Sequence, residues 1–109
     1  MEFRIPSYFA LATLIDGPLH GYAIVRRAAE LSDGGVRLST GTLYALLDRA
    51  TDEGLVVAGE PYVEGGRTRR DYTLTPAGRQ ALAAEAVRLE HAARTVTHRL
   101  RVTARAVTQ

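Results

Sequence analysis

Residues 38–54, LSTGTLYALLDRATDEG, carry the clearest structural signal of the chain and predict a helix. Ser39 suits the N-cap position, because its hydroxyl can accept an unpaired N–H of the first turn. Gly54 stands where a helix is expected to end. The apolar residues in between recur at intervals of three and four and so form one stripe. This stripe consists of Leu43, Leu46, Leu47 and Ala50.

The opposite face of this helix carries almost no side chain near its N-terminus, where Gly41 and Ala45 lie. A glycine inside a helix costs about 0.5–1 kcal/mol relative to alanine. A helix that enters the major groove of DNA with its N-terminal end first benefits from a bare face, because its backbone can approach closely. The alternative is a surface helix in which the glycine is simply tolerated.

A basic hairpin with glycines at its tip follows in residues 55–75. Leu55 begins a strand, and Pro61 indicates that the middle of this strand is an edge position. The segment 64–66, Glu-Gly-Gly, predicts a turn, after which Tyr72 and Leu74 alternate as a returning strand. The arginines that can contact a phosphate backbone or a minor groove are Arg67, Arg69 and Arg70.

The order of these elements favours a winged helix-turn-helix, a DNA-binding fold, over a solvated charged turn on an unrelated domain. The predicted fold class is therefore mainly α with a small β-hairpin. Residues 5–15 and 19–31 are expected to form two further helices, joined to the third by a turn at residues 32–36. His20 is expected at the start of the second helix in a structural role. The residues expected on buried faces of that helix are Tyr22, Ala23, Val25 and Ala29.

A last helix is predicted to begin at Thr75-Pro76 and to continue to the C-terminus. Its apolar residues alternate in spacings of four and three over nearly four heptads. At ~45 Å, from 1.5 Å per residue, the helix is too long to bury this stripe on one small domain. We expect it to pair with a second copy of the chain; the alternative is a helix folded back on residues 5–15 alone. The expected dimerisation residues are Leu82, Leu89, Ala93, Val96 and Leu100.

The 109 residues are thus expected to form one compact unit with two parts. Residues 1–75 form the winged helix-turn-helix DNA-binding domain, and residues 76–109 form the dimerisation helix.

Charge is distributed unevenly along the chain. Residues 1–79 hold nine arginines and ten acidic residues, a net charge of −1, whereas residues 80–109 hold five arginines and two glutamates. Positive surface in the DNA-binding part must therefore be local, at the wing tip and at Arg26, Arg27 and Arg37. The same balance favours one alternative function, a winged-helix protein-interaction module without DNA binding.

Several other classes of protein find no support in the sequence. The absence of cysteine excludes disulfides and thiolate metal sites. No nucleophile–base pair, phosphate-binding glycine loop or carboxylate pair is visible, so the chain is not expected to be an enzyme. His91 and His98 lack further ligands, so neither a metal nor a cofactor is expected. No signal peptide or membrane span is visible, which makes a cytoplasmic protein the expectation.

Four motifs resemble the PadR family of transcriptional regulators. They are LHGYAI at 19–24, LSTGTLY at 38–44, DEGLV at 52–56 and GRTRRDYTLTPAGR at 66–79. The length and the single C-terminal helix are similar to those of the smaller PadR subfamily. The resemblance implies a homodimeric winged-helix repressor whose DNA binding is loosened by an effector. The expected partners are a palindromic operator of double-stranded DNA and a small hydrophobic effector.

The resemblance also implies which residues lie near DNA. By the family pattern these are the hydroxyl residues and the tyrosine of the recognition helix, together with the wing tip. With Gly41, Arg49 and Arg69 added from the helix and hairpin patterns, the expected DNA-binding residues are Ser39, Thr40, Gly41, Thr42, Tyr44, Arg49, Gly66, Arg67 and Arg69.

One hypothesis places an effector pocket between the first and last helices, lined by Tyr8, Phe9, Val96 and Leu100. The alternative, favoured for at least one of Tyr8 and Phe9, is packing in the core. The chain departs from the family pattern at Ala45, where proline is common, and at Ala50-Thr51, where leucine is common. It also has no tryptophan, which puts in doubt the mode in which some small PadR proteins hold flat aromatic drugs.

Overall fold

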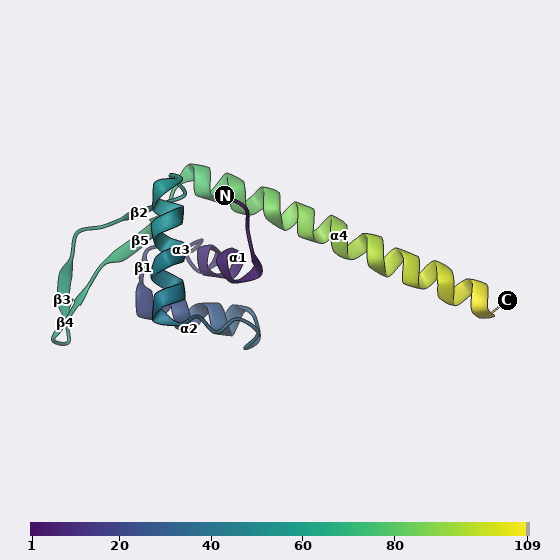
Figure 1. The fold of residues 1–109 in the computed structure, drawn as a ribbon, viewed down its shortest axis with the longest axis horizontal. Helices are drawn as coiled ribbons and strands as arrows, with labels where there is room; N and C mark the ends of the chain where they lie inside the picture. The colour runs from purple at the N-terminus through teal and green to yellow at the C-terminus, as the bar shows by residue number, and fades with distance from the viewer. Residues whose placement is uncertain (109) are drawn as a thin grey trace.

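The computed structural model of the chain describes residues 1–108, with side chains to residue 106. Figure 1 shows a globular part from which a two-stranded wing projects on one side and a long helix on the other. The fold is a winged helix-turn-helix with a long C-terminal helix, as the sequence predicts. The elements are α1 (Ile5–Ala12), β1 (Leu19–His20), α2 (Gly21–Leu31), α3 (Thr40–Asp52), β2 (Val56–Ala58), β3 (Tyr62–Glu64), β4 (Arg67–Arg69), β5 (Asp71–Leu74) and α4 (Pro76–Thr108).

Helix α3 follows the sequence prediction closely. Its N-cap is Ser39, whose hydroxyl accepts the Thr42 N–H at 3.2 Å. The predicted stripe of α3 is buried against the rest of the domain. Just beyond the end of the helix, Gly54 adopts a φ of 74°, a conformation that favours glycine.

Two helix boundaries differ from the prediction. Helix α1 ends at Ala12 rather than at residue 15, because the N–H groups of Leu14 and Ile15 donate to carbonyls three residues back instead of four. Helix α2 begins at Gly21 rather than at residue 19, because Leu19–His20 form the short strand β1 instead. Pairing of β1 with the distant strand β5 decides this boundary.

The strands form two small antiparallel sheets. In the first, the order is β1-β5-β2, with Leu19 opposite Tyr72 and Val56 opposite Leu74. The second sheet contains β3 and β4 alone and forms the wing. Pro61 lies between β2 and β3, where the chain leaves the first sheet, which agrees with its predicted edge position.

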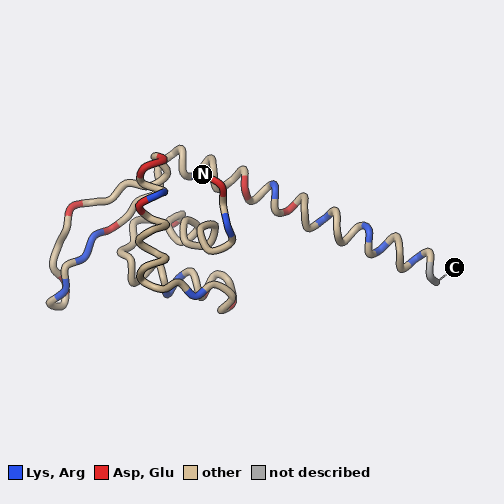
Figure 2. Tube along the Cα trace, in the orientation of Figure 1, with Lys and Arg blue, Asp and Glu red and all other residues tan. Residues whose placement is uncertain are grey.

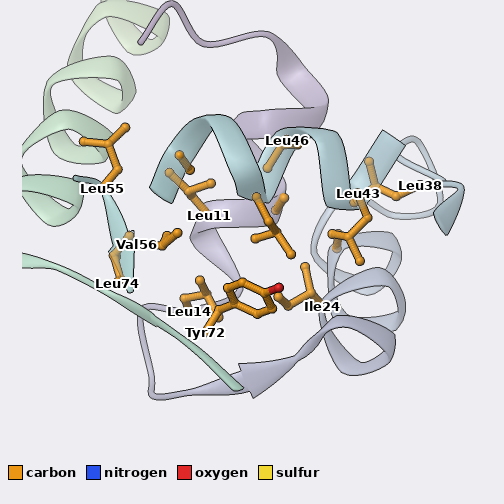
Figure 3. Packing of buried hydrophobic residues seen from close by; sticks show 14 of the residues in the cluster. Leu11, Leu14, Ile24, Leu38, Leu43, Leu46, Leu55, Val56, Tyr72 and Leu74 are labelled. Carbon is orange, nitrogen blue, oxygen red and sulfur yellow. The ribbon is translucent and has the colours of Figure 1, made fainter. Parts of the chain in front are cut away.

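The core lies where α1, α2 and α3 meet the first sheet and the beginning of α4. Figure 3 shows Tyr72 of β5 close to Leu14 and Ile24, beneath the leucines of α3. Tyr22, expected on a buried face of α2, is 63% exposed. That expectation was wrong, because α2 turns Ile24 rather than Tyr22 toward the core. The largest fully buried side chains are Leu11, Leu14, Ile24, Leu43, Leu47 and Val56.

Helix α4 packs on the domain only through its first turns. Leu82 is buried in the core of its own chain, whereas residues 91–106 are exposed throughout. The principal extents of 66 × 26 × 22 Å reflect this projecting helix (Figure 1). Among the described residues, no helix is both long and apolar enough to cross a membrane.

Gly78 sets how closely α4 approaches the first sheet, and replacing it tests this packing. A Cβ at this position would overlap the Leu55 carbonyl oxygen and lie 2.7 Å from Leu74 Cδ1. The Leu55 carbonyl already accepts the Thr75 N–H at 3.0 Å, so it has little freedom to move.

We therefore expect Gly78→Ala to lower the free energy of unfolding by about 1–3 kcal/mol, measured by urea denaturation at fixed protein concentration. Gly41→Ala is the matched control, because a Cβ there meets nothing within 4 Å. The control should gain about 0.5–1 kcal/mol from helix propensity. Equal stability changes in the two variants would contradict the packing described for α4.

Candidate nucleic-acid interface

The outer face of α3 is open where the sequence analysis expects DNA to lie. Gly41 is exposed, and the space above it is empty to 4 Å. The Ser39 hydroxyl donates to the Thr42 hydroxyl at 2.9 Å, so two polar side chains stand at the exposed N-terminal end of the helix. The predicted α3 residues are all exposed: Ser39, Thr40, Gly41, Thr42, Tyr44 and Arg49.

The wing presents a tight basic tip. Gly65 and Gly66 have φ values of 57° and 76°, which side-chain-bearing residues adopt only at a cost. The turn sets Glu64 opposite Arg67, whose side chain is exposed beside the two glycines. Figure 2 shows arginines at this tip, along α2 and along the distal half of α4, whereas acidic residues gather near the C-terminal end of α3. Positive charge is therefore local, as the composition requires.

A cleft of about 390 Å³ separates the wing from the beginnings of α2 and α3. Tyr44 of α3 forms one wall, and the wing arginines Arg67, Arg69 and Arg70 form the other. Three of the predicted DNA-binding residues, Tyr44, Arg67 and Arg69, therefore line one open cleft. The cleft also includes His20, Gly21 and Tyr22, for which the sequence analysis predicted no functional role.

Gly21 allows Tyr44 to cross the start of α2. A Cβ at Gly21 would lie 2.7 Å from the Tyr44 hydroxyl oxygen. Tyr44 therefore lies close over Gly21, lines the cleft and stays 44% exposed. The His-Gly-Tyr motif is the sequence signal for this contact, but its reason lies in the packing of α2 against α3.

His20 forms the N-cap of α2, which confirms its expected structural role. Its Nδ1 accepts the Ala23 N–H at 3.2 Å. Arg69 Nη1 lies 3.0 Å from Nδ1 and 2.9 Å from Nε2 of the same ring. Arg69 therefore extends from the wing toward α2, whereas Arg67 is exposed at the tip.

A second contact ties the wing to the first sheet. The Tyr62 hydroxyl of β3 donates to Asp71 Oδ1 of β5 at 2.6 Å. This hydrogen bond to a carboxylate raises the pKa of Tyr62 above its ordinary value, with smaller contributions from desolvation and nearby acidic groups. Tyr62 thus links the wing to β5, the central strand of the first sheet.

The geometry agrees with a family comparison. Residues 10–84 match the model of the transcriptional regulator PadR-like family. The chain belongs to this family. It is therefore a transcriptional regulator of the DNA-binding, winged-helix type rather than a member of an enzyme family.

Two curated relatives share much of this PadR domain. The chain is 44% identical over 81 residues to the transcriptional regulator Rv3488 of Mycobacterium tuberculosis, covering 74% of this chain and 72% of that one. It is 47% identical over 86 residues to an uncharacterized 37.1 kDa protein of transposon Tn4556 in Streptomyces fradiae. That match covers 79% of this chain but only 23% of the transposon protein.

Solved PadR structures share the fold. Bacillus subtilis PadR in complex with operator DNA superposes with a TM-score of 0.67 at 28% identity, over 77% of this chain and 49% of that one. The chain therefore spans about half the length of that relative. The putative transcriptional regulator TA0346 of Thermoplasma acidophilum has a TM-score of 0.69 at 27% identity, over 88% of this chain and 89% of that one.

The four residues expected in the effector pocket do not meet within one PadR chain. Tyr8 lines an apolar hollow of about 210 Å³ with Leu82 and Ala86, and Phe9 packs edge-on against Tyr8 at 5.5 Å. Val96 and Leu100 lie on the distal part of α4, where they are 58% and 65% exposed. Val96 is 14 residues beyond Leu82, or ~21 Å along the helix axis.

The predicted dimerisation residues also fall into two groups, one packed on the domain of the same chain and one exposed on distal α4. Leu82 is buried in its own chain, and Leu89 is half-buried. Ala93, Val96 and Leu100 are exposed on a part of α4 that contacts nothing else in the described chain. Residues 1–106 contain no group of three or more metal-ligating side chains.

Proposed function

We propose that this PadR protein is a sequence-specific repressor that binds a palindromic operator as a homodimer and is released by a small hydrophobic effector. One observation carries the proposal: α3 has an open face at Gly41, and its Tyr44 lines the same cleft as Arg67, which the glycine-tipped wing exposes. Such a regulator acts where its DNA is, in the cytoplasm. The relation to Bacillus subtilis PadR, a protein solved with its operator, supports the DNA-binding part.

In this proposal α3 enters the major groove with its N-terminal end first. The bare position Gly41 lets the backbone approach the bases, while Ser39, Thr40, Thr42 and Tyr44 supply hydroxyl groups to base edges and phosphates. Arg67 at the wing tip contacts a flanking phosphate or the minor groove. The two α3 helices of a dimer would enter successive major grooves about 34–36 Å apart.

Pairing of two α4 helices gives the proposed dimer. Residues 1–75 bind DNA, and residues 76–109 hold the two copies together. The exposed apolar side chains of distal α4 have no intramolecular cover, so a second copy is the most economical partner. Because Leu82 is already buried, the seam depends on Leu89, Ala93, Val96 and Leu100.

The effector site would be completed only in the dimer. The hollow beside Tyr8 in one copy would be closed by Val96 and Leu100 from the α4 of a second copy. An effector held there changes DNA affinity only if it binds two dimer arrangements with different strength. The site is apolar, which favours a hydrophobic effector.

A protein-interaction module without DNA binding is the second candidate. The net charge of −1 over residues 1–79 favours it, as do the exposed acidic residues Asp48 and Asp52 on α3. The two functions differ in their response to salt. A DNA binder releases counterions and loses affinity steeply as salt rises, whereas an apolar protein interface does not.

The deciding measurement is fluorescence anisotropy at two salt concentrations. The probes are a labelled duplex from the region upstream of the protein's own gene and a scrambled duplex. Tight, selective and salt-sensitive binding supports the repressor. Salt-sensitive binding to both duplexes places the operator elsewhere. No binding to either duplex favours the protein-interaction module.

Arg67→Ala is expected to weaken binding to both duplexes and to lower the salt slope by about 1, because one phosphate contact is lost. Arg67→Lys is the matched control, since lysine keeps the positive charge and should retain most of the affinity. Unchanged affinity in Arg67→Ala would remove the wing tip from the proposed interface.

Gly41→Ala is expected to stabilise the fold and yet weaken operator binding, since its methyl group occupies the gap through which the backbone meets the bases. Gly41→Glu should lower operator affinity by more than about tenfold, ~1.4 kcal/mol, without unfolding the protein. Thr51→Glu is the control, because it adds the same charge at the C-terminal end of α3. It should retain more operator affinity than Gly41→Glu. Full operator binding by Gly41→Glu would mean that another face of α3 meets DNA.

Val96→Glu is expected to shift the protein toward monomer, because it places a charge in the proposed seam. Val102→Glu is the matched control, since Val102 is also exposed but lies off the heptad stripe. Sedimentation velocity over a range of protein concentrations measures the difference. An equal effect of both substitutions would rule out the heptad stripe as the dimer contact.

A further inference from the structure

A row of stacked side chains connects the wing to α2. Arg69 of β4 lies on the ring of His20, with its Nη1 3.0 and 2.9 Å from the two ring nitrogens. The His20 ring stacks on Tyr22 at a centroid distance of 6.5 Å and an interplanar angle of 20°. Arg26 in turn lies over the Tyr22 ring, with its Cζ 5.8 Å from the ring centroid. We call Arg69, His20, Tyr22 and Arg26 the wing stack.

The contact between Arg69 and His20 is a face contact rather than two hydrogen bonds. The lone-pair directions of the two ring nitrogens diverge, so a single donor atom cannot lie along both. The nearly equal distances therefore place Nη1 above the ring, in the manner of a cation–π contact. Nδ1 meanwhile accepts the Ala23 N–H, which holds the ring at the start of α2.

Arg69 is also more enclosed than the other wing arginines. Its Nε is buried and has no hydrogen-bond partner among the described residues, whereas the side chains of Arg67 and Arg70 are exposed. A buried Nε cannot reach a phosphate unless the side chain moves. Arg69 thus lies in the wall of the cleft with its Nη1 on the His20 ring, whereas Arg67 is exposed at the wing tip.

The wing needs such a contact because its own sheet is small. Strands β3 and β4 pair only with each other, and a two-stranded hairpin is marginally stable alone. Two side-chain contacts fix it to the domain: Arg69 on His20, and Tyr62 on Asp71. They act at the same place, since Tyr62 is opposite Arg69 in the wing and His20 is opposite Asp71 in the first sheet.

We propose that Arg69 is a positioning residue, which sets the angle of the wing by stacking on His20 and does not itself bind a DNA phosphate. This deepens the proposed function, on which its DNA-binding readouts rest, and reassigns a residue that the sequence pattern placed among the DNA contacts. The wing stack then lets α3 and the wing tip meet DNA at the same time.

Lysine substitution separates positioning from phosphate binding. Lysine keeps the charge that a phosphate requires but lacks the planar guanidinium that stacks on a ring. We expect Arg69→Lys and Arg69→Ala to lose operator affinity equally, by roughly tenfold, with an unchanged salt slope. Arg67→Lys and Arg67→Ala are the matched pair of controls. Of these two, only Arg67→Ala should lose operator affinity and show a lower salt slope. Retained affinity in Arg69→Lys, with a lower salt slope in Arg69→Ala, would overturn the proposal.

His20→Asn tests the partner of Arg69, because asparagine remains a good N-cap but offers no ring. It should lose as much affinity as Arg69→Ala, and the double variant should be no weaker than either single variant. Additive losses would show that the two residues act separately and would overturn the proposal. Thermal unfolding of each variant verifies that the domain remains folded.

A spin label provides a readout that does not depend on DNA. The chain has no cysteine, so Val63→Cys on β3, which is 74% exposed, gives one unique labelling position in the wing. The proposal predicts a more mobile label in Arg69→Ala, Arg69→Lys and His20→Asn, and no change in Arg67→Ala. An unchanged line shape in the Arg69 variants would overturn it. If the unaltered protein binds no duplex, the proposed function fails, and the line shape still decides whether Arg69 holds the wing.

Discussion

Pairing along strand β5 is the constraint on which the rest of the structure depends. Its four residues, Asp71–Leu74, pair with β1 on one side and with β2 on the other. The first pairing fixes the start of α2, and the second fixes the exit from α3. Directly after β5, Thr75 donates its N–H to the Leu55 carbonyl and caps α4 by accepting the Gly78 N–H at 2.9 Å. One short strand thus sets the relative positions of α2, α3, the wing base and the long C-terminal helix.

The surface around α3 and the wing carries little net charge, and its distinguishing features are single residues such as Gly41 and Arg67. Tertiary packing stabilises α3 through its buried leucines. Its outer face can therefore carry Gly41, although glycine has a low helix propensity. Glycines in the wing turn allow the strands to reverse tightly beside Arg67. Because residues 1–79 carry no net positive charge, binding to DNA would depend on where each arginine points rather than on their number. The contrast between Arg67 and Arg69, two residues apart, illustrates this dependence.

Sequence patterns predicted which helices and strands form better than they predicted the residues at which these begin and end. The period of the α3 leucines, the Ser39 cap and the Thr75-Pro76 start of α4 are local signals, and all three are confirmed. Residues 19–20 were assigned to a helix because nothing local reveals that they pair with β5. Tyr22 was wrongly expected to be buried, since only the angle of α2 on the core decides which of its apolar residues point inward. The roles of the predicted DNA-binding residues stay predictions, although the structure exposes most of them and brings Tyr44, Arg67 and Arg69 to one cleft.

The sequence by itself determined the winged helix-turn-helix class and the long heptad helix, because periodicity, caps and turn residues act over a few positions. Its motifs also indicated the family, through their resemblance to PadR proteins. Only the tertiary structure decided that Leu82 is buried in its own core, that Gly21 makes room for Tyr44, and that Arg69 turns back onto His20. All three join different elements, and the last two link residues 23 positions apart (Gly21 and Tyr44) and 49 positions apart (His20 and Arg69). The meeting of such residues depends on how strands and helices pack, and no local pattern encodes that packing.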